Sequence, residues 1–397
     1  MQARVTHVLA LSERPGKLVW AGAERHLRLL LPALARAGVD VEAIVLATAP
    51  GPVVAEGLAE WRRAGVGVTL LARRARASRL RSVPAVLWQH CRLWGALRRR
   101  RRRIVHLHLD LLAMPCAAAA AGCPHVVVTL HNEVLLPRAA WAAVLLRVWL
   151  GWLGRRVTRF VAISERVRAH FVALVAGTAG KVDVVEYGYE LAAARPPTRA
   201  ALGWPADAFL VGFVGRLVFE KNPLVLVDAM AAHRDMHLVM VGDGPLRPDV
   251  ERLIAARGLA NVHLAGAIES AGRLVPLFDV LCLPSRWEGL GLVLVEAMLQ
   301  GVPVVGSRRG AVPDILGDGA YGLLFDPDRG DELAAALAAV RRDRAAARRR
   351  AWAAAAYAAD RFSVAAMVAR TRRVYERAAP PPAALAGACG RVRRAAT

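Results

Sequence analysis

The sequence has few cysteines and no long apolar run. An odd number of cysteines is scattered along the chain, and none stands in a Cys-X-X-Cys pair: Cys91, Cys116, Cys123, Cys282 and Cys389. This pattern argues against a disulfide framework, so we expect reduced thiols in a cytosolic protein. No apolar run reaches the roughly 18 residues that a transmembrane helix needs, and the run at Leu111–Gly122 is too short. The amino-terminal residues also lack a signal-peptide layout.

Lysine and acidic residues are scarce as well. Of the 55 basic residues only Lys17, Lys181 and Lys221 are lysines, and all the others are arginines. With 32 acidic residues the formal net charge is +23. Such an excess indicates an anionic partner: acidic lipid, nucleic acid or a phosphorylated substrate.

Strand and helix patterns alternate along most of the chain. Apolar runs typical of buried parallel strands occur in two series, which Pro196 and Pro197 separate. The predicted strands are Arg4–Leu11, Val41–Leu46, Val66–Leu71, Ile104–Leu107, His125–Leu130, Arg159–Ile163, Phe209–Val214, His237–Val241, Val262–Leu264, Asp279–Leu283, Pro303–Val305 and Gly322–Phe325. We therefore predict an α/β protein of two doubly wound domains, at 1–192 and 200–363. A closing helix should follow at about 364–378, and a disordered tail at 379–397.

The stretch Pro284–Met298 predicts a strand, a glycine loop and a helix in succession. Unpaired amides at a helix N-terminus suit a phosphate, and glycines let the backbone approach it closely. Glu288 precedes the helix and Glu296 lies inside it, on a largely apolar segment. A carboxylate in such a segment costs free energy unless it has hydrogen-bond donors, and sugar hydroxyls are good donors.

A second group of candidate residues follows Phe209–Val214, the first predicted strand of the second domain. Gly215, Arg216 and Lys221 stand where open α/β sheets bind their ligands. A nucleoside diphosphate gains negative charge as it leaves a sugar, and an arginine fork and a lysine ammonium stabilise that charge.

These motifs carry a family resemblance. Glu288 and Glu296 match the EX7E pattern, and GFVGRLVFEKNP at 212–223, VGDGP at 241–245 and GVPVVGSRRGAVPDIL at 301–316 flank it in order. The chain resembles retaining glycosyltransferases of family 4 over residues 4–378. The resemblance implies the GT-B fold, in which two Rossmann-like domains face a central cleft. The first domain would bind the acceptor and the second the nucleotide sugar.

The resemblance also implies roles for individual residues. Glu288 would hold donor-sugar hydroxyls, Glu296 the ribose hydroxyls, and His131 the donor sugar near the reacting carbon. Backbone contacts to sugar, phosphate or base would come from Gly22, Gly266, Ala267, Gly289, Leu290, Gly291 and Leu292. The family usually has two glycines before the glutamate of the first loop, where this chain has Ala21-Gly22-Ala23-Glu24. Asp243 is expected to be a turn residue.

No metal is predicted at the donor site. No DxD motif ends a strand, and Arg216 and Lys221 can neutralise the diphosphate, so we expect metal-independent transfer and no cofactor. His106 and His108 share one face of a predicted strand, but the sequence shows no third ligand beside them.

The basic stretch Arg73–Arg103 contains no acidic residue and includes Trp88 and Trp94. Arginines with aromatics suit anionic lipid headgroups. Nucleic acid would be attracted by the same field but is the less favoured partner. The segment Trp141–Trp152 is expected to be a core-packed helix or to border a lipid channel.

These observations predict a glycosyltransferase that moves a sugar from a UDP- or GDP-sugar to a lipid-linked or cell-envelope polysaccharide acceptor. It would lie at the inner face of a membrane. Two alternatives remain open: a nucleotide-sugar epimerase on the same fold, or a basic membrane- or nucleic-acid-binding protein with a relict donor site.

Overall fold

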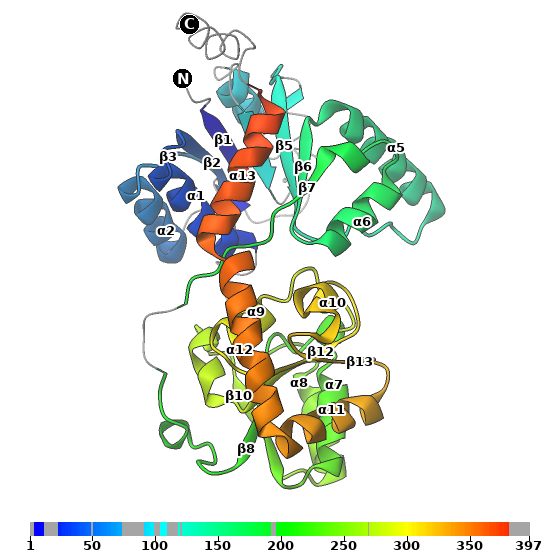
Figure 1. Cartoon of the computed structure of the whole chain (residues 1–397). Helices are drawn as coiled ribbons and strands as arrows, with labels where there is room; N and C mark the ends of the chain where they lie inside the picture. The colour runs from blue at the N-terminus through cyan, green and yellow to red at the C-terminus, as the bar shows by residue number, and fades with distance from the viewer. Residues whose placement is uncertain are drawn as a thin grey trace, which may run out of the picture. The chain divides into compact units, whose positions relative to one another are not determined.

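The computed structural model describes residues 4–11, 23–48, 51–73, 91–98, 104–108, 118–119, 121–191, 196–268 and 270–380. It divides into two compact units (Figure 1). Unit 1 comprises residues 1–163, 167–185 and 367–397, and unit 2 comprises residues 164–166 and 186–366. The tail beyond residue 380 and most of Arg73–Arg103 lie outside the described residues.

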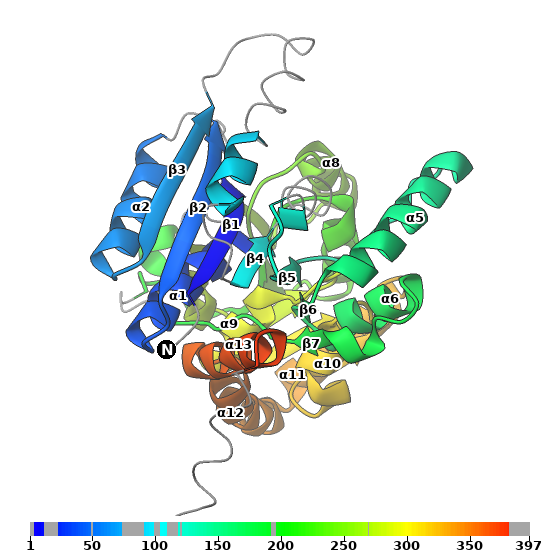
Figure 2. The same cartoon turned by 90° about the horizontal axis from the view of Figure 1, so that it is seen from above.

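Unit 1 is built on a seven-stranded parallel sheet with the order β3-β2-β1-β4-β5-β6-β7 (Figure 2). Its strands are β1 Val5–Leu11, β2 Val41–Thr48, β3 Gly67–Arg73, β4 Ile104–His108, β5 His125–Leu130, β6 Arg159–Ala162 and β7 Val182–Val184. Every residue of β4 is buried. The short edge strand β7 was not predicted from the sequence, because three residues carry too weak a pattern.

The α-helices of unit 1 include α1 Ala23–Arg36, α2 Pro52–Arg63, α5 Ala140–Arg156, α6 Glu165–Leu174 and α13 Val364–Ala378. Residues 91–98 are also helical. α13 joins unit 1 from Met367 onward. There the hydroxyl of Tyr375 lies within hydrogen-bond distance of His106 of β4, which ties the end of the chain to the first sheet.

Unit 2 has a six-stranded parallel sheet with the order β10-β9-β8-β11-β12-β13. Its strands are β8 Phe209–Val214, β9 Met236–Val241, β10 Val262–Gly266, β11 Val280–Leu283, β12 Val304–Ser307 and β13 Leu323–Phe325. Its helices include α7 Pro223–Ala229, α8 Arg247–Arg257, α9 Leu292–Leu299, α10 Val312–Ile315, α11 Gly330–Arg342 and α12 Arg344–Arg361. A core cluster of buried apolar side chains joins β8, β9 and β11 to α7 and α11.

Both sheets reverse their strand order once, between β1 and β4 in unit 1 and between β8 and β11 in unit 2. Parallel α/β sheets bind ligands beyond the carboxyl ends of their strands at such a switch point. The predicted fold class, two doubly wound α/β domains, is therefore confirmed. In unit 2 a ligand is therefore expected beside the loops that follow β8 and β11.

Candidate active site

The loops after β8 and β11 meet at the switch point of unit 2. The ammonium of Lys221, which ends a 3-10 turn at Phe219–Lys221, forms an ion pair with the carboxylate of Glu288. Ser285 Oγ donates a hydrogen bond to the same Glu288 oxygen at 3.2 Å. Both charged side chains are only partly exposed, at 23% and 13%. The fold thus joins two predicted site residues that stand far apart in the sequence.

A close backbone approach supports the loop after β8. Gly242, which follows β9, has φ +143°, and a Cβ there would lie 1.9 Å from the carbonyl oxygen of Gly215. The amide of Gly215 donates to Val241 O at 3.0 Å, and that of Leu217 to Asp243 O at 3.0 Å. Only glycine fits at position 242, because a side chain would push the Gly215–Arg216 segment away.

Asp243 makes the local contacts of a turn residue. Its Oδ1 accepts a hydrogen bond from the amide of Gly244 at 2.7 Å, and its other oxygen lies 4.0 Å from Arg247 Nη1. Asx side chains often stabilise turns by such bonds to nearby amides. Asp243 therefore stabilises the turn after β9, a role that requires no ligand.

The loop after β12 fixes the backbone of Glu288. The amide of Ala311 donates to Glu288 O at 3.0 Å, and a Cβ on Gly310 would lie 2.5 Å from that same oxygen. Gly291 caps α9 in the left-handed conformation, with φ +73°. The chain after Glu288 therefore turns sharply into the N-terminus of α9, where the first amides have no partner within the helix.

Glu296 lies in the second turn of α9 and is 5% exposed. Its Oε2 and the hydroxyl of Tyr189 lie 2.8 Å and 3.1 Å from the point where Gly272 would carry a Cβ. The 3-10 helix Ala271–Leu277 therefore packs directly against this carboxylate. A carboxylate held in so confined a place is able to accept hydrogen bonds from the hydroxyls of a ligand.

The remaining predicted residues of unit 2 lie at the same edge of the sheet. Arg216 follows β8 and is exposed, and among the described residues no ion pair involves it. Gly266 ends β10 in the left-handed conformation and accepts a hydrogen bond from the amide of Gly242 at 2.7 Å, and Ala267 follows it. Gly289, Leu290 and Leu292 belong to the loop and the first turn of α9.

Two predicted residues fall in unit 1. Gly22 lies outside the described residues. His131 directly follows β5 and is 8% exposed. Burial lowers the pKa of His131 to about 3, so its ring is neutral near pH 7. A neutral imidazole can donate from one nitrogen and accept at the other.

Several residues that build the site were not singled out from the sequence: Ser285, Gly310, Gly272 and Tyr189. Ser285 lies in the stretch Pro284–Met298 and Gly310 in the motif at 301–316, so the sequence motifs did indicate that these two positions lie near the site. Gly272 and Tyr189 carried no such signal, because they come together near Glu296 only in the tertiary fold.

Two doubly wound parallel sheets, with a paired lysine and glutamate and a glycine-capped helix at the second switch point, define the class of a two-domain α/β transferase. Residues 20–193 match the family model Glycosyltransferase Family 4, and residues 194–359 match Glycosyl transferases group 1. The chain belongs to glycosyltransferase family 4. This match confirms the predicted family and the predicted GT-B fold. It also confirms that the protein is a glycosyltransferase.

Individual relatives agree with this assignment. The chain is 31% identical over 312 residues to the 2-deoxystreptamine glucosyltransferase of Streptomyces kanamyceticus, covering 70% of this chain and 80% of that protein. It is 34% identical to a D-inositol 3-phosphate glycosyltransferase of Mycolicibacterium gilvum, over 46% of this chain and 44% of that one. Among solved structures, the Anabaena protein HepE (Alr3699) in complex with UDP superimposes with a TM-score of 0.76. That match has 22% identity and covers 94% of this chain and 99% of HepE.

Proposed function

We propose that this protein is a retaining glycosyltransferase that transfers a sugar from a UDP- or GDP-sugar to a lipid-linked or polysaccharide acceptor of the cell envelope. The observation that carries the proposal is the Lys221–Glu288 pair at the switch point of unit 2. The structures of HepE with UDP and with UDP-glucose support a nucleotide-sugar donor on this fold.

In the proposed mechanism the diphosphate of the donor lies against the loop after β8. Arg216 and Lys221 stabilise the negative charge that develops on the leaving diphosphate, and the first amides of α9 add to that field. Glu288 holds sugar hydroxyls while its ion pair keeps the Lys221 ammonium in place. Glu296 holds the ribose, and His131 contacts the sugar near the reacting carbon. Attack on the same face as departure, guided by the diphosphate, retains the anomeric configuration.

A thermal-shift screen tests the donor. A ligand that binds only the folded chain raises its melting temperature, by an amount that grows with the ratio of ligand concentration to Kd. We expect UDP- or GDP-sugars to raise the melting temperature more than ADP- or dTDP-sugars do. Incubation with the best donor alone then separates transfer from epimerisation, since an epimerase would return an isomeric nucleotide sugar. No shift with any of the four would contradict the proposed donor site.

Chelation tests whether the donor site needs a metal. If Arg216 and Lys221 carry the leaving-group charge, EDTA should leave at least about half of the transfer rate, because no divalent cation then bridges the phosphates. The measurement is turnover before and after dialysis against EDTA. Complete loss that Mg²⁺ or Mn²⁺ restores would contradict metal-independent transfer.

The exposed face of α5 supports attachment to a membrane. Trp141 and Val148 are 72% and 67% exposed, and Val144 and Leu145 lie between them on the helix. This differs from the core-packed helix expected from the sequence, although Leu150, Leu153 and Gly154 are buried at its other end. Spacings of three, four and seven residues put these apolar side chains on one side of the helix.

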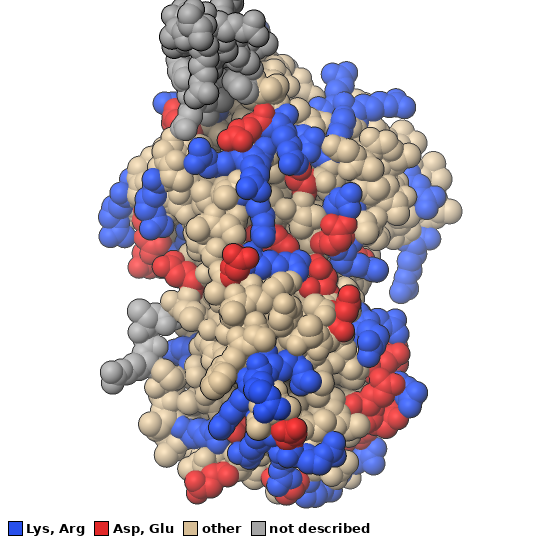
Figure 3. All heavy atoms as spheres, viewed as in Figure 1, with Lys and Arg blue, Asp and Glu red and all other residues tan. Residues whose placement is uncertain are grey.

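Basic side chains accompany this apolar face. α5 contains no acidic residue and ends in Arg155 and Arg156. On the face of the molecule that Figure 3 shows, basic side chains (blue) cover more of the surface than acidic ones (red). In the described part of the arginine-rich stretch, the guanidinium of Arg98 lies 5.2 Å from the centre of the Trp94 ring. An apolar face with basic residues is typical of helices that lie in the interface of anionic bilayers. Among the described helices, none is long and apolar enough to span a membrane.

Vesicle binding tests the membrane proposal. Changing Arg98–Arg103 to glutamine should weaken binding to anionic vesicles, with a larger loss at low salt, where screening is weakest. A Trp141→Ser, Val148→Ser double variant should also bind less, but with little salt dependence, because it removes apolar area. Donor hydrolysis without acceptor is the control and should change less than about twofold in both variants. Unchanged vesicle binding, or tight binding to nucleic acid instead, would contradict the proposal.

A second candidate is a small soluble acceptor. The relative from Streptomyces kanamyceticus is named for transfer to 2-deoxystreptamine, an aminocyclitol. Assays with a lipid-linked sugar acceptor and with aminocyclitols separate the two candidates. Turnover on the aminocyclitol alone would favour the soluble acceptor.

A further inference from the structure

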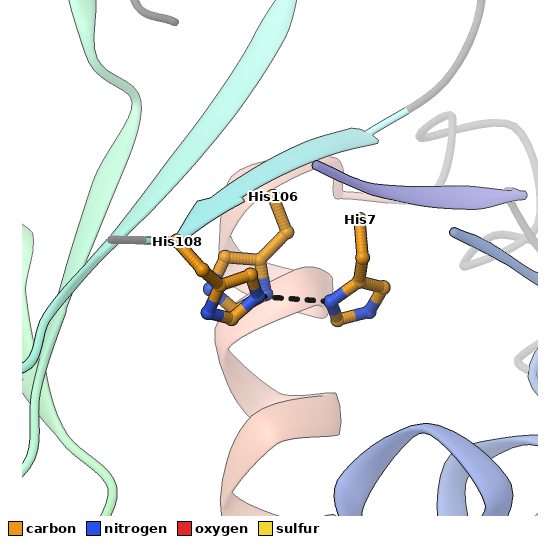
Figure 4. A group of neighbouring side chains, drawn as sticks. All are labelled: His7, His106 and His108. Atoms are coloured by element: carbon orange, nitrogen blue, oxygen red, sulfur yellow. Dashed lines mark hydrogen bonds between the residues drawn. The ribbon is translucent and has the colours of Figure 1, made fainter. Parts of the chain in front are cut away.

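Three histidines meet on one face of the sheet of unit 1 (Figure 4). His7 of β1 pairs with His106 of β4 in the parallel register of the two strands. Paired residues on neighbouring strands point to the same face, and so do residues two apart on one strand. The register therefore brings His7 next to His106 and His108, and it supplies the third histidine that the sequence alone did not reveal.

The three imidazoles are close enough to share one ion. His7 Nδ1 lies 3.0 Å from His108 Nε2, and one ring nitrogen of each histidine falls within 4.8 Å of the others. All three are at most 1% exposed. Burial lowers the pKa of His7 to about 3 and lowers those of His106 and His108 well below the ordinary value. Each ring is thus neutral near pH 7, the form that binds metals.

The outer nitrogens of these rings already have partners. His7 Nε2 lies 3.1 Å from the hydroxyl of Tyr375, and His108 Nδ1 lies 3.4 Å from His131 Nε2. His106 differs, because its Nδ1 lies 2.9 Å from the Tyr375 hydroxyl and its Nε2 lies 2.7 Å from Thr129 Oγ1, so an ion binds His106 only by displacing one of these two contacts. Metal-binding histidines usually hold their second nitrogen in such a hydrogen bond, which fixes the tautomer and the orientation of the ring.

We propose that His7, His106 and His108 form a binding site for one late first-row transition metal ion, with Zn²⁺ as its commonest occupant. Two imidazole nitrogens on a tetrahedral zinc ion are about 3.3 Å apart, given Zn–N distances near 2.0–2.1 Å. The present separation of 3.0 Å between His7 Nδ1 and His108 Nε2 needs to open by only a few tenths of an ångström. The ion would take the place of the proton between these two nitrogens, and that proton would move to the outer nitrogen of its own ring, His7 Nε2 facing the Tyr375 hydroxyl or His108 Nδ1 facing His131.

The proposed ion links β1 to β4 in the interior of unit 1, and α13 supplies the Tyr375 hydroxyl behind two of its ligands. Three histidines leave one position of a tetrahedral ion open, and the site lies apart from the Lys221–Glu288 pair, which belongs to unit 2. Three imidazole ligands without thiolates suit zinc, copper, nickel or cobalt better than magnesium or calcium, which prefer oxygen.

Equilibrium dialysis of the full chain, without a polyhistidine tag, against micromolar Zn²⁺ tests the site. We expect about one zinc per chain by elemental analysis, and with Co²⁺ the visible absorption of a tetrahedral site. A His7→Gln or His108→Gln variant should bind zinc at least about tenfold more weakly. Tyr375→Phe, which keeps all three ligands, should lose about 10–100-fold in affinity because the outer nitrogen of His7 loses its partner.

The chain contains its own control. In unit 2 His237 Nδ1 lies 2.9 Å from His263 Nε2, a pair with the same contact but no third histidine among the metal-binding groups found in the described residues. A His263→Gln variant should bind zinc as the wild type does. Wild-type protein that takes up no zinc, or that loses zinc equally in His263→Gln and His7→Gln, would overturn the proposal. The wild-type measurement decides even if a variant in the core fails to fold.

Discussion

A Lys221→Ala variant should lose roughly 10²-fold or more of its turnover while keeping its fold, as when one preorganised donor to a transition-state charge is removed. The ammonium of Lys221 is paired with Glu288 and is largely shielded from water. Its loss removes a charge that stabilises the leaving diphosphate. Within the described part of the chain, it also leaves the Glu288 carboxylate with Ser285 Oγ as its remaining side-chain hydrogen-bond partner. Initial rates at saturating donor, with circular dichroism to check the fold, measure both effects.

Lys181 offers a matched control for this variant. It is another of the three lysines, and its Nζ donates to the carbonyl oxygens of Gly154 at 3.0 Å and Val157 at 3.3 Å in unit 1. Lys181→Ala should change donor hydrolysis less than about threefold, even if it lowers the melting temperature. Arg216→Ala should resemble Lys221→Ala. Near-wild-type turnover in both site variants would mean that the leaving group binds elsewhere.

A Gly242→Ala variant should suffer a comparable loss without any change at a charged residue. Its new methyl group would lie 1.9 Å from the carbonyl oxygen of Gly215, at a φ of +143° that side chains rarely adopt. The loop that carries Arg216 must move, and misplacement of a binding group by about 1 Å can cost about 10²-fold in rate. We expect unit 2 to lose on the order of 3 kcal/mol in stability. Urea unfolding and turnover measure the two effects.

A variant at Gly258 is the control that distinguishes the steric clash at position 242 from backbone strain alone. It ends α8 with φ +57°, and a Cβ there would meet no atom within 4 Å. Gly258→Ala should therefore cost only about 1 kcal/mol, from strain alone, and should leave turnover unchanged. Equal losses in the two variants would mean that the approach of Gly242 to Gly215 does not shape the site.

Much of the fold could be predicted because buried parallel strands have continuous apolar sequences that stand between helical segments. Twelve strands were expected where the structure has strands, and β7 was missed because it is only three residues long. The order of the strands does not follow from such runs. The meeting of the loops after β8 and β11 became evident only from the order β9-β8-β11-β12.

The motifs located the candidate site, and tertiary packing supplied its partners. The sequence placed Lys221 and Glu288 in separate motifs, and the structure joins them. It showed His106 and His108 on one strand, but His7 joins them through a register that no local pattern encodes. The exposure of Trp141 had no local signal either, because an apolar helix has the same composition whether it faces a core or a membrane.

The configuration of the sugar released from the donor tests the central proposal most directly. Many transferases slowly hydrolyse their donor when no acceptor is present, and proton NMR distinguishes the first anomer formed before it equilibrates. With an α-linked UDP- or GDP-sugar, wild-type protein should release the α-anomer together with the nucleoside diphosphate, and Lys221→Ala should release both at least about 10²-fold more slowly. Initial release of the β-anomer, or an unchanged rate in the variant, would contradict retaining transfer at the Lys221–Glu288 site.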